Sequence, residues 1–137
     1  MSGAPASRPA HAGSFLAFDF GTRRIGVAVG NSLTRSAQAL RTVAGEGERR
    51  FDEIAVLVCE WQPEALVVGV PLHPDGAEHD NTRRARRFAR QLHGRFRLVV
   101  HEVDERYSTT EAQSGAAPDV DAASAAIILE QFLRGLP

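Results

Sequence analysis

Residues 15–29 read Phe-Leu-Ala-Phe-Asp-Phe-Gly-Thr-Arg-Arg-Ile-Gly-Val-Ala-Val. Two short apolar runs, residues 15–20 and 25–29, flank a turn that begins at Gly21, and this pattern is typical of a β-hairpin. Asp19 lies inside the first apolar run. Because an ionised carboxylate in apolar surroundings is costly unless it is paired or binds a cation, Asp19 is the first candidate for a functional residue.

Downstream of this hairpin, the apolar residues switch between helical and strand spacing. This spacing predicts strands 39–43, 65–70 and 98–103, helices 51–61, 81–93 and 120–133, and a short helix that follows a capping box at 108–111. A hairpin followed by alternating helices and strands favours an α/β fold with a central mixed β-sheet and helices packed on it. The strands 15–20, 65–70 and 98–103 are continuously apolar, which predicts that they are neighbours covered on both faces.

Length and composition limit the class of protein. A chain of 137 residues with 43% hydrophobic and 24% charged residues corresponds to one globular domain, which we expect over 15–137 after a flexible tail at 1–14. The single cysteine, Cys59, excludes an internal disulfide, and we expect it to be a buried thiol in a reducing compartment. No apolar run is long enough to span a membrane, and the N-terminus lacks the apolar segment of a secretory signal. We therefore expect no membrane partner.

Acidic residues also follow the last predicted strand and begin the last predicted helix. Asp104 and Glu105 come directly after the strand, and Asp121 lies in the first turn of the helix. Functional groups gather at the carboxyl ends of parallel strands, so Asp19, one of the two middle acids and Asp121 are expected to converge on a site for Mg²⁺ or Mn²⁺. Structural roles remain open: a turn cap for Asp19, an ion pair with Arg106 for the middle acids, and a helix-dipole role for Asp121.

All 16 basic residues are arginines, and the net charge of −1 gives no overall signature of nucleic-acid binding. Their distribution is uneven, because seven of them lie between residues 83 and 97, most on the polar side of the predicted helix 81–93. Guanidinium groups match phosphate oxygens, so this helix is a candidate nucleic-acid contact, with a merely solvated face as the alternative. The arginines that we assign to nucleic-acid binding are Arg23, Arg24, Arg83, Arg87, Arg90 and Arg106.

Four segments together resemble the motifs of the YqgF/RuvX family. They are Phe18–Ala28, Val68–Leu72 with Asp75-Gly76, Asp104–Ala112 and Val120–Leu129, within a resemblance that covers residues 15–134. Members of this family are named pre-16S rRNA nucleases and are similar to Holliday junction resolvases. The resemblance implies an RNase H-like fold and a cytoplasmic, metal-dependent nuclease that processes the 5′ end of pre-16S rRNA during ribosome biogenesis. It also implies catalytic and metal-binding roles for Asp19, Glu105 and Asp121, with two ions of Mg²⁺ or Mn²⁺.

The chain departs from the family pattern between Gly115 and Val120, where a longer, lysine-containing segment is usual. This departure predicts a weaker grip on the phosphate backbone. Two other functions remain open: cleavage of branched DNA such as a Holliday junction, and non-catalytic binding of nucleic acid on the same fold. A nucleotide-binding kinase or ATPase shares the Asp-Phe-Gly-Thr turn but needs two such domains. Ribosomal particles are a further candidate partner, and the sequence is compatible with a monomer or a homodimer.

Overall fold

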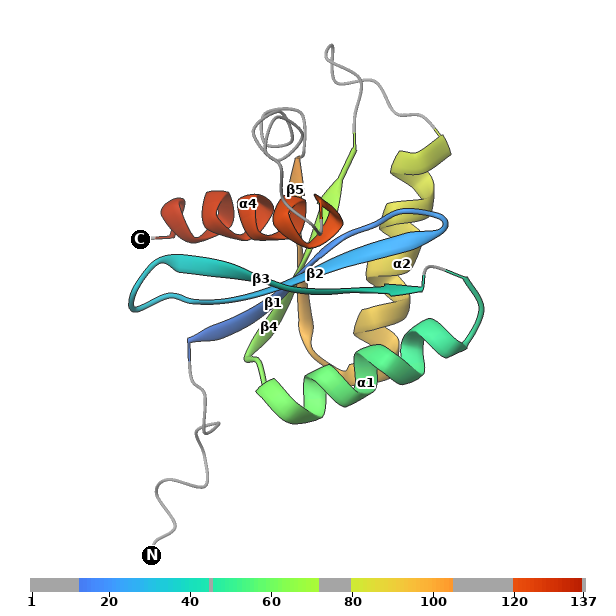
Figure 1. Cartoon of the computed structure of the whole chain (residues 1–137), viewed down its shortest axis with the longest axis horizontal. Coiled ribbons are helices and arrows are strands. Elements are labelled where there is room, and N and C mark those ends of the chain that lie inside the picture. The colour runs from blue at the N-terminus through green and yellow to red at the C-terminus, as the bar shows by residue number, and fades with distance from the viewer. Residues whose placement is uncertain (1–12, 45, 72–79, 105–119, 137) are drawn as a thin grey trace, which may run out of the picture.

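The computed structural model describes residues 13–44, 46–71, 80–104 and 120–136 (Figure 1). The strands within these residues are β1 (Ser14–Asp19), β2 (Arg24–Asn31), β3 (Ser36–Ala44), β4 (Ala65–Val70) and β5 (Val99–Asp104). The helices are α1 (Arg49–Trp61), α2 (Asp80–Phe96) and α4 (Val120–Arg134). The predicted α/β architecture is confirmed, and the short helix predicted after 108–111 lies outside the described residues. β1 begins at Ser14, one residue before the predicted start of the domain.

The sheet is mixed and has the strand order β3-β2-β1-β4-β5. β1 pairs antiparallel with β2, as the turn sequence predicts, and β2 pairs antiparallel with β3. β4 runs parallel to β1, and β5 runs parallel to β4. Parallel neighbours need a long crossover, which α1 and α2 supply. The three apolar strands are therefore neighbours, as predicted, with β1 at the centre of the sheet.

Helices cover both faces of the sheet, α1 and α2 on one face and α4 on the other (Figure 1). Successive side chains of a strand point to opposite faces. Leu16 and Phe18 of β1 accordingly pack in the cluster with α1 and α2, whereas Phe15 and Ala17 pack with α4. β1 and β4 are buried over nearly their whole length, which accounts for their continuous apolar sequence.

β5 differs from the sequence prediction. It lies at the edge of the described sheet, and the side chain of Val99 is 57% exposed. The prediction that residues 98–103 are covered on both faces is therefore wrong. An edge strand has a neighbouring strand on one side only, so its side chains reach solvent even when the sequence is apolar.

The buried stripe of α1 also corrects one prediction. Phe51, Ile54 and Leu57 are buried, and Trp61 is partly buried against the same cluster, as expected for a core residue. Cys59 is exposed, so the prediction of a buried thiol is wrong. Its apolar neighbours in the sequence suggested burial. At about 100° per residue, however, Cys59 points away from the stripe that runs through Ile54 and Leu57.

Small residues allow α4 to approach the sheet closely. Ala122 and Ala125 are buried, as the small-residue composition of this helix predicts. The closest approach is at Gly26 of β2, where an added Cβ would lie 1.8 Å from the carbonyl oxygen of Asp121. The backbone of the helix therefore rests directly on the backbone of the strand.

We expect Gly26→Ala to destabilise the protein strongly. Overpacking typically costs about 1–3 kcal/mol when side chains can yield, and here the obstacle is backbone, so we expect a loss of about 3 kcal/mol or more in the free energy of unfolding. This corresponds to a fall in Tm of roughly 10 °C for a domain of this size. Urea denaturation and thermal melting followed by circular dichroism measure both quantities.

Gly94→Ala is the matched control, because an added Cβ on this α2 residue would have no atom within 4 Å. Alanine is favoured over glycine in a helix, so this variant should gain about 0.5–1 kcal/mol. A Gly26→Ala protein as stable as the wild type would contradict the contact between α4 and β2.

Candidate active site

Asp19 is the last residue of β1 and lies on the face of the sheet that α4 covers. This face follows from the alternation along the strand, since Phe15 and Ala17 share its parity and pack with α4. Asp19 pairs with Gly26 of β2 on one side and with Gly69 of β4 on the other. Directly opposed residues share a face of the sheet, and neither glycine has a side chain. The two neighbouring strands therefore place no side chain directly beside the carboxylate.

Asp121 approaches Asp19 from the first turn of α4. Its carbonyl oxygen is the atom that an added Cβ on Gly26 would meet, so its backbone lies directly over that glycine. Gly26 is the β2 partner of Asp19, so the backbone of Asp121 lies over the residue next to Asp19 in the sheet. The structure thus brings the backbones of these two predicted site residues to the same end of the strands and the same face of the sheet.

Arg24 binds the carboxylate of Asp121. Its Nε lies 3.1 Å from Oδ2 of Asp121. The side chain of Arg24 is 72% exposed and that of Asp121 is 31% exposed, so this is a solvent-screened ion pair. The sequence predicts that Arg24 contacts nucleic acid, but it does not predict the pair with Asp121, because nothing in it indicates that the hairpin turn and α4 meet.

Of the two candidates for the middle acid of the predicted site, the structure describes only Asp104. In β5, the ring of His101 lies 4.8 Å from that of Phe132 of α4, whereas Glu102 reaches back to Arg86 of α2, with Oε1 3.3 Å from Nε. Asp104 has the parity of Glu102, so alternation directs it to the α2 face, away from Asp19. Glu105 and Arg106 lie outside the described residues.

The carboxylates of Asp19 and Asp121 are of the ligand type that suits a hard divalent cation, because such ions prefer carboxylate oxygens. Within the residues that the structure describes, no group of three or more His, Cys, Asp or Glu side chains is placed to hold a metal ion. A complete ligand set therefore needs at least one residue from outside the described ranges, or solvent.

The arginines of α2 point in several directions around the helix axis, and they have different neighbours. Arg83 forms an ion pair with Asp80 at the start of the helix. Arg87 lines a pocket towards α1, and Arg90 lines a different pocket beside β5. Arg23 is exposed in the turn that follows β1. Arg83, Arg87 and Arg90 recur at i, i+4 and i+7 of α2, and the positions of all four residues are compatible with nucleic-acid contacts.

Two arginines outside the predicted set belong to the pocket towards α1. Arg84 of α2 and Arg50 of α1 line it together with Arg87. Arg84 carries the same sequence signal as its neighbours. Arg50 had none, because its proximity to α2 arises only when the two helices pack on the same face.

Comparison with known proteins identifies relatives over almost the whole chain. The model of the RuvX family, described as Holliday junction resolvase, matches residues 13–135. A protein named "Putative pre-16S rRNA nuclease" from Polaromonas sp. is 64% identical over 124 residues, which span 90% of each chain. Proteins of the same name are 61% identical in Albidiferax ferrireducens, over 97% of this chain and 88% of the relative, and 56% identical in Burkholderia pseudomallei, over 90% of each.

Solved structures share the fold at much lower sequence identity. Thermus thermophilus RuvC, in complex with a Holliday junction substrate, has a TM-score of 0.56 and 15% identity over 88% of this chain and 92% of its own. A second Thermus thermophilus RuvC structure has a TM-score of 0.55 and 14% identity. The predicted RNase H-like fold is confirmed by this similarity. None of the described helices is both long and apolar enough to cross a membrane.

We expect Arg24→Gln to leave the stability of the protein nearly unchanged. Exposed ion pairs contribute about 0–1 kcal/mol, so the change in the free energy of unfolding should stay below about 1 kcal/mol and should shrink further in high salt. Urea denaturation at low and high salt measures it. A loss of several kcal/mol would mean that the pair with Asp121 holds α4 on the sheet, contrary to its exposure.

Proposed function

The chain belongs to the RuvX family, and on this premise we propose that it is a metal-dependent nuclease that processes the 5′ end of pre-16S rRNA in the cytoplasm. The observation that carries the proposal is the approach of Asp19 and Asp121 at one edge of the sheet, made possible by Gly26. Relatives that are 56–64% identical bear the name of this activity. Precursor rRNA, free or within a ribosomal particle, is the proposed partner.

Asp19, Glu105 and Asp121 are the residues that we propose as catalytic and as ligands of Mg²⁺ or Mn²⁺. A pair of such ions supplies an activated water and stabilises the attacking and leaving oxygens of a phosphodiester. The donor set consists of carboxylates, which is the ligand type that these ions prefer. Neither Gly26 nor Gly69, the residues paired with Asp19, places a side chain beside its carboxylate.

The strand parity of β5 supports Glu105 over Asp104 as the third ligand. Asp104 shares its parity with Glu102, which contacts α2 on the opposite face. If the alternation continues by one residue, position 105 falls on the face of Asp19. This reasoning favours the assignment that the family motif also implies.

Arg24 and Arg23 are placed to guide the substrate. The pair between Arg24 and Asp121 positions the carboxylate at the edge of the sheet and leaves the exposed guanidinium other N–H groups that can donate to a phosphate oxygen. Arg23 extends from the same turn. We propose that Arg83, Arg87, Arg90 and Arg106 contribute further contacts to the nucleic-acid backbone.

Cleavage of a four-way DNA junction is the second candidate function. The observation that favours it is the description of the matching family model as Holliday junction resolvase. The same carboxylates would serve, because hydrolysis of either backbone needs the same groups around the phosphate. The substrate therefore has to be determined by direct comparison.

We expect Asp19→Asn to lower the cleavage rate by at least about 100-fold, roughly 2.7 kcal/mol of transition-state stabilisation. The substitution keeps the shape of the side chain and removes the charge that would bind the cation. The measurement compares precursor rRNA, linear single-stranded RNA and a four-way DNA junction side by side with Mg²⁺, Mn²⁺ or a chelator. Full activity in the chelator, or in the variant, would refute the metal-dependent mechanism, and binding without cleavage would indicate a non-catalytic module.

The folded state provides the control for this variant. Without metal, the melting temperature of Asp19→Asn should equal or slightly exceed that of the wild type, because crowded carboxylates repel one another. A large drop in melting temperature would mean that lost activity reflects lost structure.

The choice between the middle acids is testable with a matched pair of variants. Glu105→Gln should abolish cleavage as Asp19→Asn does, whereas Asp104→Asn should retain most of the activity, because its side chain has the opposite parity. Single-turnover rates with excess enzyme give the comparison. The reverse ranking would show that the strand does not continue its alternation past Asp104.

A further inference from the structure

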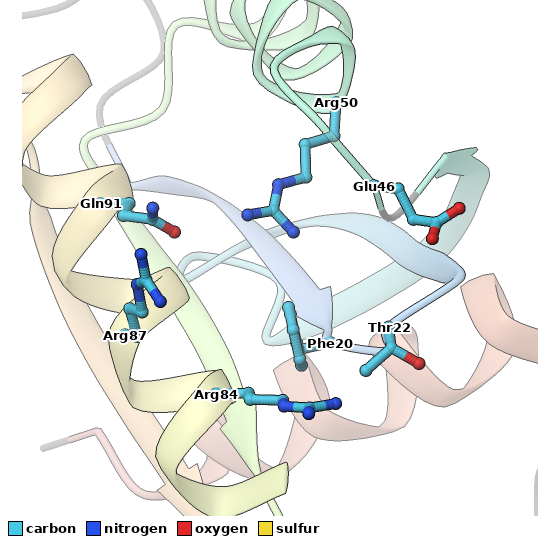
Figure 2. A pocket seen from close by; sticks show the side chains of 7 residues that line it. All are labelled: Phe20, Thr22, Glu46, Arg50, Arg84, Arg87 and Gln91. Carbon is cyan, nitrogen blue, oxygen red and sulfur yellow. The ribbon is translucent and has the colours of Figure 1, made fainter.

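A cationic pocket of about 320 Å³ lies on the opposite face of the sheet from the carboxylates, and we call it the arginine pocket. Its basic lining consists of Arg50 from α1 with Arg84 and Arg87 from α2 (Figure 2). Phe20, Thr22 and Gln91 complete most of the wall. Figure 2 shows the three guanidinium groups extending into the space between the two helices and the end of β1.

The described lining of the arginine pocket carries three arginines and one acidic residue. Within the described residues, neither Arg84 nor Arg87 has an acidic side chain at ion-pair distance. Glu46 is the one acidic residue among the described lining residues, and Figure 2 shows its carboxylate directed away from the guanidinium groups. Arg83 and Arg86 on the same helix do have carboxylate partners, Asp80 and Glu102.

Arg50 is held in place by aromatic rings. Its Cζ lies 4.8 Å from the ring centre of Phe51 and 5.6 Å from that of Phe88. Burial is the main cause that lowers the pKa of the Arg50 guanidinium; Glu48 opposes this effect, and the positive charges of Arg87 and Arg95 add to it. The cations of the pocket therefore repel one another, and a bound anion would relieve that repulsion.

The arginine pocket is also connected to the candidate active site through the chain. Phe20 lines the pocket and directly follows Asp19, and the two side chains point to opposite faces of the sheet. The ring of Phe20 packs 5.2 Å from that of Phe88. The arginine pocket and Asp19 therefore lie on opposite faces of the sheet at the same end of β1.

We propose that the arginine pocket binds a phosphate group of a nucleic-acid strand while another phosphate of the same strand lies at Asp19. This inference rests on the proposed function and deepens it, because it names a second phosphate-binding position. Guanidinium groups donate two parallel hydrogen bonds to phosphate oxygens, and Thr22 and Gln91 offer further donors. The aromatic surface of Phe20 suits the sugar or base attached to that phosphate.

The test combines Arg84→Gln and Arg87→Gln in one protein and leaves Arg50 unchanged, because Arg50 packs on two rings. We measure binding of a short fluorescein-labelled single-stranded RNA by anisotropy in a chelator, where no metal-dependent cleavage occurs. Loss of charge-assisted hydrogen bonds should weaken binding by about 10- to 100-fold. The slope of log K against log salt should fall by about 0.7 for each lost phosphate contact.

The matched control is Arg41→Gln with Arg134→Gln, which removes the same charge from β3 and the end of α4. Both residues are at least half exposed and have their own carboxylate partners, Glu53 and Glu130. Binding should change little in this control. If the control loses as much RNA affinity as the pocket variant, the effect comes from net charge alone and the proposal is overturned. Unchanged RNA binding in the pocket variant would also overturn it.

Inorganic phosphate separates this proposal from the nuclease proposal. Added phosphate should raise the Tm of the wild type above that in chloride at equal ionic strength, and the pocket variant should lose this increase. If the pocket variant loses the phosphate effect and the wild type cleaves no substrate under any condition, the pocket proposal is supported and the nuclease proposal is refuted. Cleavage by the wild type with no difference between it and the pocket variant in phosphate or RNA binding would refute the pocket alone.

The source of the phosphate is resolved by RNA ends. Oligonucleotides with a 5′-hydroxyl, a 5′-phosphate or a 3′-phosphate are compared on the wild type and the pocket variant. A loss of affinity that is the same for all three indicates a backbone phosphate, and a loss confined to one phosphorylated end indicates a terminal phosphate.

Discussion

The contact between the backbone of α4 and Gly26 is the constraint on which the candidate site depends. Two packed helices normally have their axes about 8–10 Å apart, because side chains separate their backbones. Here the carbonyl of Asp121 occupies the space that any side chain at position 26 would need. The first turn of α4 therefore contacts the sheet directly, next to the end of β1. A single missing Cβ thus determines both how firmly α4 packs and how near Asp121 comes to Asp19.

Because successive residues of a strand face opposite sides of the sheet, the acidic and the basic groups near the end of β1 lie on opposite faces. Asp19 and Phe20 are consecutive, yet the first belongs to the α4 face and the second lines the arginine pocket. The sheet between them keeps most guanidinium groups away from the candidate metal ligands. Arg24 is the described exception, and its exposed pair with Asp121 is weak enough to be exchanged for other partners. A cation and a polyanion can therefore be accommodated on neighbouring surfaces without neutralising each other's binding groups.

The sequence was sufficient to predict the hairpin, the position of Asp19 at the end of a strand and that of Asp121 in the first turn of a helix, because each follows from local spacing. It was not sufficient to place β5 at an edge, since an apolar run does not reveal how many strands flank it. The prediction of a buried Cys59 was wrong for a related reason. Its apolar neighbours in the sequence suggested burial, whereas its position around the axis of α1 directs its side chain to solvent. The arginine pocket could not be predicted, because Arg50 and Arg84 meet only through the packing of two helices on one face.

Net charge is a poor guide to the electrostatics of this chain. The total is −1, and along α2 the charges of Arg83 and Arg86 are offset by carboxylates, whereas those of Arg84 and Arg87 face Arg50 across a space bounded by aromatic rings. A concave, partly apolar boundary focuses the field of these cations and strengthens their attraction for an anion.

Arginine suits this arrangement better than lysine. Its planar group stacks on rings, as Arg50 does on Phe51, and loses less freedom for each hydrogen bond that it forms. The chain lacks the lysine-containing segment usual in its family, which on sequence grounds weakens its hold on a phosphate backbone. A preorganised set of guanidinium groups on the other side of β1 offsets that loss, because fixed donors bind with a smaller entropic penalty than donors on a long loop that must first be ordered.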